Sequence, residues 1–186
     1  MTLFEYLAIA FSLLYSLAAL RLLGGLPAAL APGRRYSLHL GLSVLLLLWV
    51  AISFWTFWSL RDVDWTFPGF LIALAVPGLL YYCAAVLIPE NPNDVESWRT
   101  LYFDVHRRCF GGLAAWAVAA AVSATVNLGM GLGHPARAVH AVGTVVGLVG
   151  ATSSSPRVHR ALVVLMALLL MGASLAQLEP DWLAQS

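Results

Sequence analysis

The chain has 186 residues, of which 61% are hydrophobic and only 10% are charged, and its mean hydropathy is +0.84. A soluble domain carries about 25% charged residues, so this composition excludes an ordinary soluble protein and indicates one that lies in a membrane. The formal net charge of +1 is uninformative as a sum, and the basic residues fall at the ends of apolar segments, without the soluble domain that nucleic-acid binding would require.

Six long apolar segments predict six transmembrane helices. Each segment is apolar all round rather than along one stripe, and about 20 such residues cross a bilayer. Helices are the expected form because each satisfies its own backbone in hydrocarbon. We therefore expect an all-α, polytopic membrane helix bundle, a single transmembrane domain over residues 1–186 with spans at about 3–23, 36–59, 66–88, 107–132, 137–154 and 158–178.

The first span is expected to stay in the protein as a true helix. It lacks the basic n-region, the short apolar core and the small-residue cleavage site of a secretory signal peptide. Gly24-Gly25, Pro27 and Pro32-Gly33 are predicted to end this helix and to form the first connection.

Aromatic side chains crowd around the second connection, near residues 61–64. Aromatic rings gather where a membrane meets water, so this set predicts an interfacial belt. The alternative is a pocket for a flat lipophilic ligand such as a quinone or a carotenoid. Trp49 lies deeper in the second span and either packs in the bundle or faces lipid. The crowded residues are Phe54, Trp55, Phe57, Trp58, Trp65, Phe67 and Phe70.

The third span carries Pro77-Gly78 at its centre, and a proline there removes a backbone donor and predicts a kink. Tyr81 and Tyr82 follow the bend, where they could flank a ligand cavity or a hinge. Such kinks are ordinary in membrane helices, so a purely structural role is the alternative. Cys83 is expected to be a small apolar filler, as is Cys109.

The third connection is long enough to hold structure of its own. Asp94 is expected to cap a helix, and apolar residues such as Trp98 and Tyr102 then recur at helical spacing between charged ones. This pattern predicts a cytoplasmic interfacial amphipathic helix at about 94–106, with its apolar side on the bilayer. It would anchor two spans or, alternatively, act as a gate or a docking element.

The fourth and fifth spans hold the main polar and glycine features of the second half. Asn127 needs a partner in hydrocarbon, so it is expected to face another helix, and lining a pathway is the alternative. Gly143 and Gly147 form a motif that lets two helix backbones approach closely. The partner could be the fourth span or another subunit.

Histidines occur near both ends of the spans. His39, His106 and His159 fall near the same ends of spans two, four and six, and together they could bind a metal or haem. The alternative is contact with lipid headgroups, because no pair has the spacing of two ligands on one helix. His134 and His140 flank the other end of spans four and five and are candidates for pH sensing.

The basic residues indicate how the chain faces. All ten are arginine, and short cytoplasmic loops retain positive charge. Only Arg61 and Arg137 lie on the other side, so both termini are expected to be extracytoplasmic in a bacterial cytoplasmic membrane. The arginines of the cytoplasmic side are Arg21, Arg34, Arg35, Arg99, Arg107, Arg108, Arg157 and Arg160.

Function is indicated mainly by what the sequence lacks. No charged residue lies in the middle of a span, which argues against a carrier built on a buried carboxylate. No catalytic residue is predicted, and the absence of known motifs favours a protein that is not an enzyme. We expect a channel or transporter-like protein that passes an ion or small solute, as a homo-oligomer in contact with lipids.

Two alternatives remain open at this point. One is a non-catalytic module that senses or binds a lipophilic ligand, or that supports a larger membrane complex. The other is a redox protein that binds haem or a quinone, although no cofactor is predicted.

Several short stretches resemble a pattern found in small bacterial membrane proteins with six spans. The chain is similar to these proteins over most of its length, and the resemblance implies the bundle but no activity. It is carried by Trp65-Thr66-Phe67, Pro77, Tyr81-Tyr82, Leu87-Ile88-Pro89, Tyr102-Phe103 and His106-Arg107-Arg108.

Overall fold

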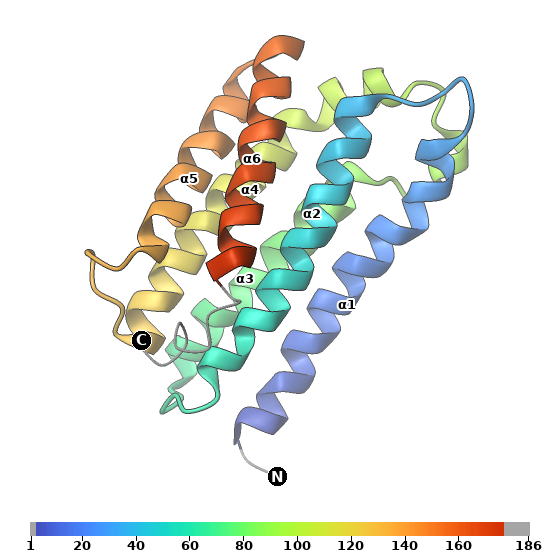
Figure 1. Ribbon diagram of the computed structural model, residues 1–186. Helices are drawn as coiled ribbons and strands as arrows, with labels where there is room; N and C mark the ends of the chain where they lie inside the picture. Colours follow the sequence, from blue (N-terminus) through green and yellow to red (C-terminus); the bar gives the residue numbers. More distant parts are fainter. Residues whose placement is uncertain (1–2, 177–186) are drawn as a thin grey trace.

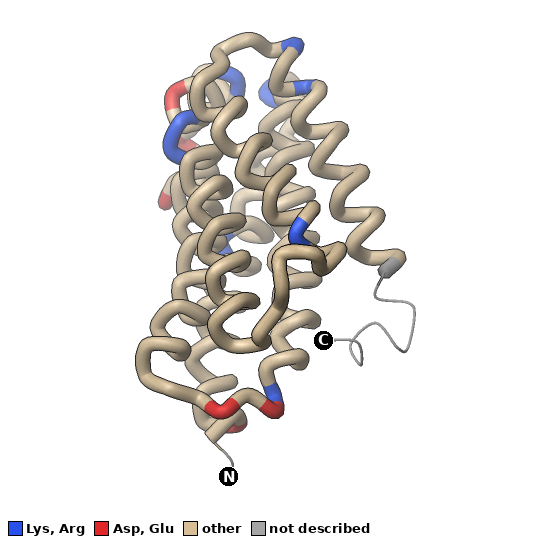
Figure 2. Tube along the Cα trace, turned by 90° about the vertical axis from the view of Figure 1, so that its left-hand side faces the viewer, with Lys and Arg blue, Asp and Glu red and all other residues tan. Residues whose placement is uncertain are grey.

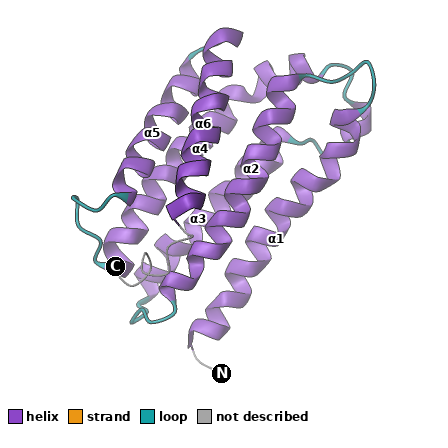
Figure 3. Ribbon diagram, in the orientation of Figure 1, coloured by secondary structure: helices purple, strands orange, loops and turns teal. Residues whose placement is uncertain are grey.

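A computed structural model describes residues 3–176, and every regular element in that range is helical (Figures 1 and 3). The helices form a ring in which α1 packs on α2 and α3, α4 packs on α3 and α5, and α6 packs on α5 and α2. The long helices are α1 (Leu3–Leu30), α2 (Ser37–Thr56), α3 (Phe67–Leu87), α4 (Trp98–Leu128), α5 (Ala136–Thr152) and α6 (Pro156–Ala176), and the two short 3₁₀ helices are η1 (Phe57–Leu60) and η2 (Pro92–Asp94).

The prediction of an all-helical membrane bundle is confirmed. Five of the six helices are long and apolar enough to cross a membrane. The remaining long helix, α5, has 17 residues, which is the lower end of the length that spans a bilayer. Within the described part of the chain α6 matches the last predicted span, whose residues 177 and 178 lie outside it.

Charged residues gather at the two ends of the bundle (Figure 2). We call the end that holds loops 31–36, 88–97 and 153–155 the arginine-rich end, and the end that holds loops 61–66 and 129–135 the opposite end. Arg34 ties two of these loops together, because its guanidinium donates to the carbonyl of Asn93 at 3.2 Å.

The first helix is longer than predicted. α1 continues through Gly24, Gly25 and Pro27 to Leu30, so these residues do not end it. Gly25 is needed inside the helix, because a Cβ there would lie within 3 Å of the Ile88 side chain. Pro27 lacks only one backbone donor near the end of the helix, where the loss is tolerated.

The predicted interfacial helix at 94–106 is also corrected. Asp94 belongs to η2 and caps nothing, whereas Ser97 caps α4 by accepting a hydrogen bond from the Thr100 backbone at 3.2 Å. The chain is then one unbroken helix to Leu128. Its apolar side faces the bundle rather than the bilayer, since Trp98 and Tyr102 are fully buried among other helices.

Side chains from other helices satisfy the end of α3. His39 of α2 donates from Nε2 to the Leu87 carbonyl at 3.0 Å, and Arg21 of α1 donates to the Ile88 carbonyl at 2.9 Å. The last carbonyls of a helix have no partner within it, so these two basic side chains stabilise an otherwise unpaired terminus. The cysteines are free and buried at the α3–α4 contact, as apolar fillers would be.

The α4–α5 contact depends on glycine. A Cβ on Gly147 would lie 2.6 Å from the backbone nitrogen of Ala114, and one on Gly143 would lie 3.3 Å from the Cβ of Ala117. The two backbones therefore approach as closely as small residues permit. The partner of this motif is α4 of the same chain.

Candidate functional site

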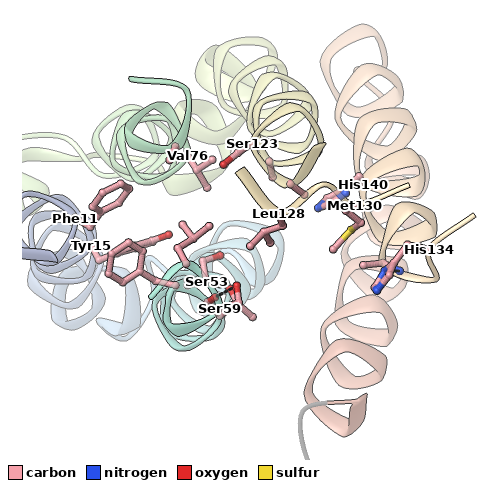
Figure 4. A pocket seen from close by; sticks show the side chains of 17 residues that line it. Phe11, Tyr15, Ser53, Ser59, Val76, Ser123, Leu128, Met130, His134 and His140 are labelled. Carbon is pink, nitrogen blue, oxygen red and sulfur yellow. Dashed lines mark hydrogen bonds between the residues drawn. The ribbon is translucent and has the colours of Figure 1, made fainter. Parts of the chain in front are cut away.

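A cavity lies between the helices (Figure 4). The residues that line it belong to the half of the bundle nearer the opposite end. The cavity consists of two adjoining hollows of about 190 and 250 Å³, and we call them together the central cavity. Helices α1 to α5 line both hollows, and α6 lines the second. The residues that line both are Tyr15, Ser53, Thr56, Val76, Ala120, Ala136 and His140.

Helical spacing brings the lining residues to one side of each helix. Trp49 and Ser53 are four residues apart on α2, and Trp116 and Ala120 are four apart on α4, so each pair shares a face. Tyr15 supplies the contribution of α1. Helices α1, α2 and α4 therefore point aromatic rings, hydroxyls and a small side chain into the same space.

Polar groups in the cavity are few and uncharged. Two nitrogens of lining residues, Nε1 of Trp116 and Nδ1 of His140, are buried and have no hydrogen-bond partner in the described chain. Ser123 accepts a hydrogen bond from Asn127 at 3.2 Å and keeps its own proton to donate. Figure 4 shows Ser53 and Ser123 on opposite sides of the same space. The Ser123 hydroxyl is therefore a donor at the edge of the cavity, inside a largely apolar wall.

No Asp, Glu or Arg is among the described residues that line the two hollows. The nearby Arg137 points elsewhere: it donates to the Ala121 carbonyl at 2.6 Å and to the Thr125 hydroxyl at 2.7 Å. It thus closes the end of α4. An ion in this space would have no opposite charge beside it, and burying an unpaired charge is costly.

The cavity ends in a packed layer toward the arginine-rich end. The rings of Trp49 and Trp116 lie 5.3 Å apart and form its floor. Beyond them Leu42, Leu46 and Leu80 are 0% exposed. Close packing of this kind leaves no room for water.

Some predicted candidates line this cavity and others do not. Trp49 and His140 do, and His134 lines the first hollow. Tyr81 and Tyr82 are 37% and 42% exposed on the outer surface of α3.

The other candidates have packing or surface positions. Asn127 donates to the Gly69 carbonyl at 3.2 Å, so its amide joins α4 to the start of α3 rather than lining a pathway. Pro77 is buried in α3, which runs on through it. Trp55 and Trp58 are 63% and 56% exposed, an arrangement that an interfacial belt explains.

The three histidines of the arginine-rich end do not form one site. His106 and His159 have rings 5.4 Å apart, but His39 instead stacks on Trp98 at 4.4 Å. Across residues 3–176 no three side chains of His, Cys, Asp or Glu are arranged to hold a metal ion. The described residues therefore give no support to the hypothesis that these three imidazoles together bind a metal.

Both nitrogens of His159 are occupied. Nε2 donates to the Ser153 carbonyl at 2.7 Å, which leaves Nδ1 to accept from the Tyr102 hydroxyl at 2.8 Å. This imidazole has no lone pair left for a metal. Its role is to join α6 to α4.

Sequence reasoning did not single out Tyr15, Ser53 or Trp116. The feature of the sequence that could have indicated these cavity residues is a hydroxyl or an indole inside an apolar span. That signal is ambiguous, because Ser12 and Ser16 have the same character and neither lines the central cavity.

No family model, curated protein or solved structure matches the chain. The fold and the cavity define its class as a helical membrane protein with a cavity between its helices that no Asp, Glu or Arg lines in the described part of the chain. Any function must be argued from these residues.

Proposed function

We propose that this protein binds a small, uncharged, lipophilic molecule in the central cavity and acts as a membrane sensor or as the binding subunit of a larger assembly. The ligand carries at least one hydrogen-bond acceptor. Of the functions considered for the sequence, binding of a lipophilic ligand has the most support from the geometry.

The volume and chemistry of the cavity carry this proposal. An engineered apolar cavity of about 150 Å³ takes up benzene, so hollows of about 190 and 250 Å³ are sufficient for a single ring with substituents. The Ser123 hydroxyl, which accepts from Asn127 and keeps its own proton, supplies a donor. A buried donor without a partner costs about 1–3 kcal/mol, and a ligand acceptor would recover that cost.

Passage of an ion or solute through one chain has less support. The layer beyond Trp49 is packed, and the residues first favoured for a pathway lie on the outer surface or between helices. A carrier would need this layer to open. Haem binding also has less support, because both nitrogens of His159 are occupied.

The proposal is tested by filling the cavity. Ala120→Phe places a ring in the space, whereas Ala115→Phe places the same ring on the exposed side of the same helix. The probe is duroquinone, a neutral ring with two carbonyls that quenches tryptophan fluorescence. Binding is measured as saturable quenching in nanodiscs.

We expect Ala120→Phe to raise the duroquinone Kd at least tenfold and Ala115→Phe to leave it within twofold. Thermal unfolding of each variant checks that it is folded. Non-saturable quenching of the unaltered protein, or equal Kd values for the two variants, would overturn the proposal.

We infer further that the membrane is a bacterial cytoplasmic membrane and that the arginine-rich end faces the cytosol. The support is the distribution of arginine, since positive loops stay on the cytoplasmic side.

A further inference from the structure

A groove runs along the outer surface between α1 and α2. We call it the α1–α2 groove, and it consists of two overlapping hollows that share Ser12, Ala51 and Phe54 as lining residues. Its wall extends along α1 from Phe4 to Ala19. At 1.5 Å per residue this is about 22 Å, or most of the hydrocarbon thickness of a bilayer.

Two aromatic side chains separate the groove from the central cavity. Tyr15 lines both hollows of the cavity and also the groove. Phe57 likewise lines the first hollow and the groove. Each ring therefore has the cavity on one side and the lipid-facing groove on the other, and we call the pair the aromatic partition.

The partition consists of ring contacts, not of backbone. Tyr15 packs edge-on against Phe54 at 5.7 Å, and Phe57 packs on Phe11 at 4.5 Å. Phe54 is 49% exposed, so the outer side of Tyr15 rests on a side chain that itself faces lipid. Rotation of these two rings would connect the two spaces without a change in the backbone.

We propose that the ligand is a lipid with one small neutral head and one hydrocarbon chain, that its head occupies the central cavity, and that its chain leaves past Tyr15 and Phe57 to lie in the α1–α2 groove. This inference rests on the proposed function and names the ligand class and its route. The ligand enters from the membrane plane rather than from water.

The chemistry of the two spaces fits the two parts of such a molecule. The cavity is bordered by the hydroxyls of Ser53 and Ser123, whereas the groove is lined by aliphatic and aromatic carbon with the hydroxyls of Ser12 and Ser16. A phospholipid fits poorly, because its charged headgroup would find no opposite charge among the lining residues. It also has two chains for one groove.

The test compares two benzoquinone probes, one without a hydrocarbon chain and one with a chain. Duroquinone is a head alone, and decyl-plastoquinone has a similar head with a ten-carbon chain. The groove variant combines Ser12→Leu with Ala51→Leu, and its matched control is Ala75→Leu on the exposed surface of α3. The two leucines of the groove variant would weaken binding by occupying the space of the ligand's chain. They would not act by changing the hydrophobicity of the groove, because lipid is as apolar as the groove itself.

We expect the groove variant to raise the decyl-plastoquinone Kd about tenfold and to leave the duroquinone Kd within twofold. The control should change neither. Equal Kd changes for both probes, or no change in either, would show that the groove holds bulk lipid only and would overturn this inference. A protein that fails to bind duroquinone at all overturns the proposed function instead, so the two failures are distinguishable.

A second variant tests the partition itself. Tyr15→Ala removes the ring between the two spaces, so decyl-plastoquinone should enter at least fivefold faster in stopped-flow quenching. Leu13→Ala, a neighbouring residue that is 60% exposed, should leave the rate unchanged. An unchanged rate for Tyr15→Ala would refute the route through the partition.

Discussion

The close approach of α4 and α5 predicts a measurable penalty for a single methyl group. Gly147→Ala would place a Cβ 2.6 Å from the backbone nitrogen and 2.7 Å from the Cβ of Ala114. Backbone atoms cannot rotate away, so the helices must separate locally. Overpacking of this kind costs about 1–3 kcal/mol.

Gly111→Ala on α4 is the matched control, since a Cβ there meets nothing within 4 Å. Both substitutions gain the same helix propensity, up to about 1 kcal/mol, so their difference isolates the packing cost. We expect Gly147→Ala to be less stable than Gly111→Ala by about 1–3 kcal/mol, where each 1.4 kcal/mol is about a tenfold change in the ratio of folded to unfolded protein.

The assay is reversible unfolding in mixed micelles, followed by tryptophan fluorescence. The intermediate substitution Gly143→Ala, whose Cβ would lie 3.3 Å from that of Ala117, should fall between the two. A Gly147→Ala protein as stable as the Gly111→Ala protein would refute the argument that backbone proximity determines this contact.

Two further predictions concern the hydrogen bond between Tyr102 and His159 and the orientation of the protein in the membrane. Tyr102→Phe removes the donor to Nδ1 of His159 and should lower the free energy of unfolding by about 1–3 kcal/mol, while Tyr6→Phe on the exposed surface should not; equal stability of the two variants would argue against the hydrogen bond. In bacterial cells, a membrane-impermeant maleimide should label Asp62→Cys without permeabilisation and Asn93→Cys only after it. The opposite pattern would reverse the inferred orientation.

Much of the architecture could be predicted from hydropathy, because lipid imposes one requirement on every span. Element ends were less predictable, since they depend on partners distant in the sequence. The pair Gly24-Gly25 is a turn signal by itself, yet Gly25 lies inside a helix because Ile88 packs where its Cβ would be. The start of α4 similarly depends on Ser97 and on partners for Trp98.

The candidate site was less predictable than the fold. Sequence alone does not say which side of an all-apolar helix faces inward, so Tyr81 and Tyr15 are equivalent in the sequence although only Tyr15 lines the cavity. Trp49 was left with two interpretations for the same reason, and the structure places it in the cavity floor. The side of a helix that faces the interior depends on which helices pack against it, and hydropathy does not reveal these neighbours.

The end of α1 has a consequence for how the chain is made. The Ala28 carbonyl would normally bond the residue four positions on, but that residue is Pro32, which has no N–H. It accepts instead from the Ala31 N–H at 3.3 Å, and the indole of Trp98, 70 residues later, adds a second donor at 3.3 Å. At a synthesis rate of about 5–20 residues per second, roughly 4 to 14 s pass before that partner leaves the ribosome. The end of α1 thus gains its hydrogen bond to α4 only after the start of α4 has been made, so this end is fixed to the bundle late in synthesis.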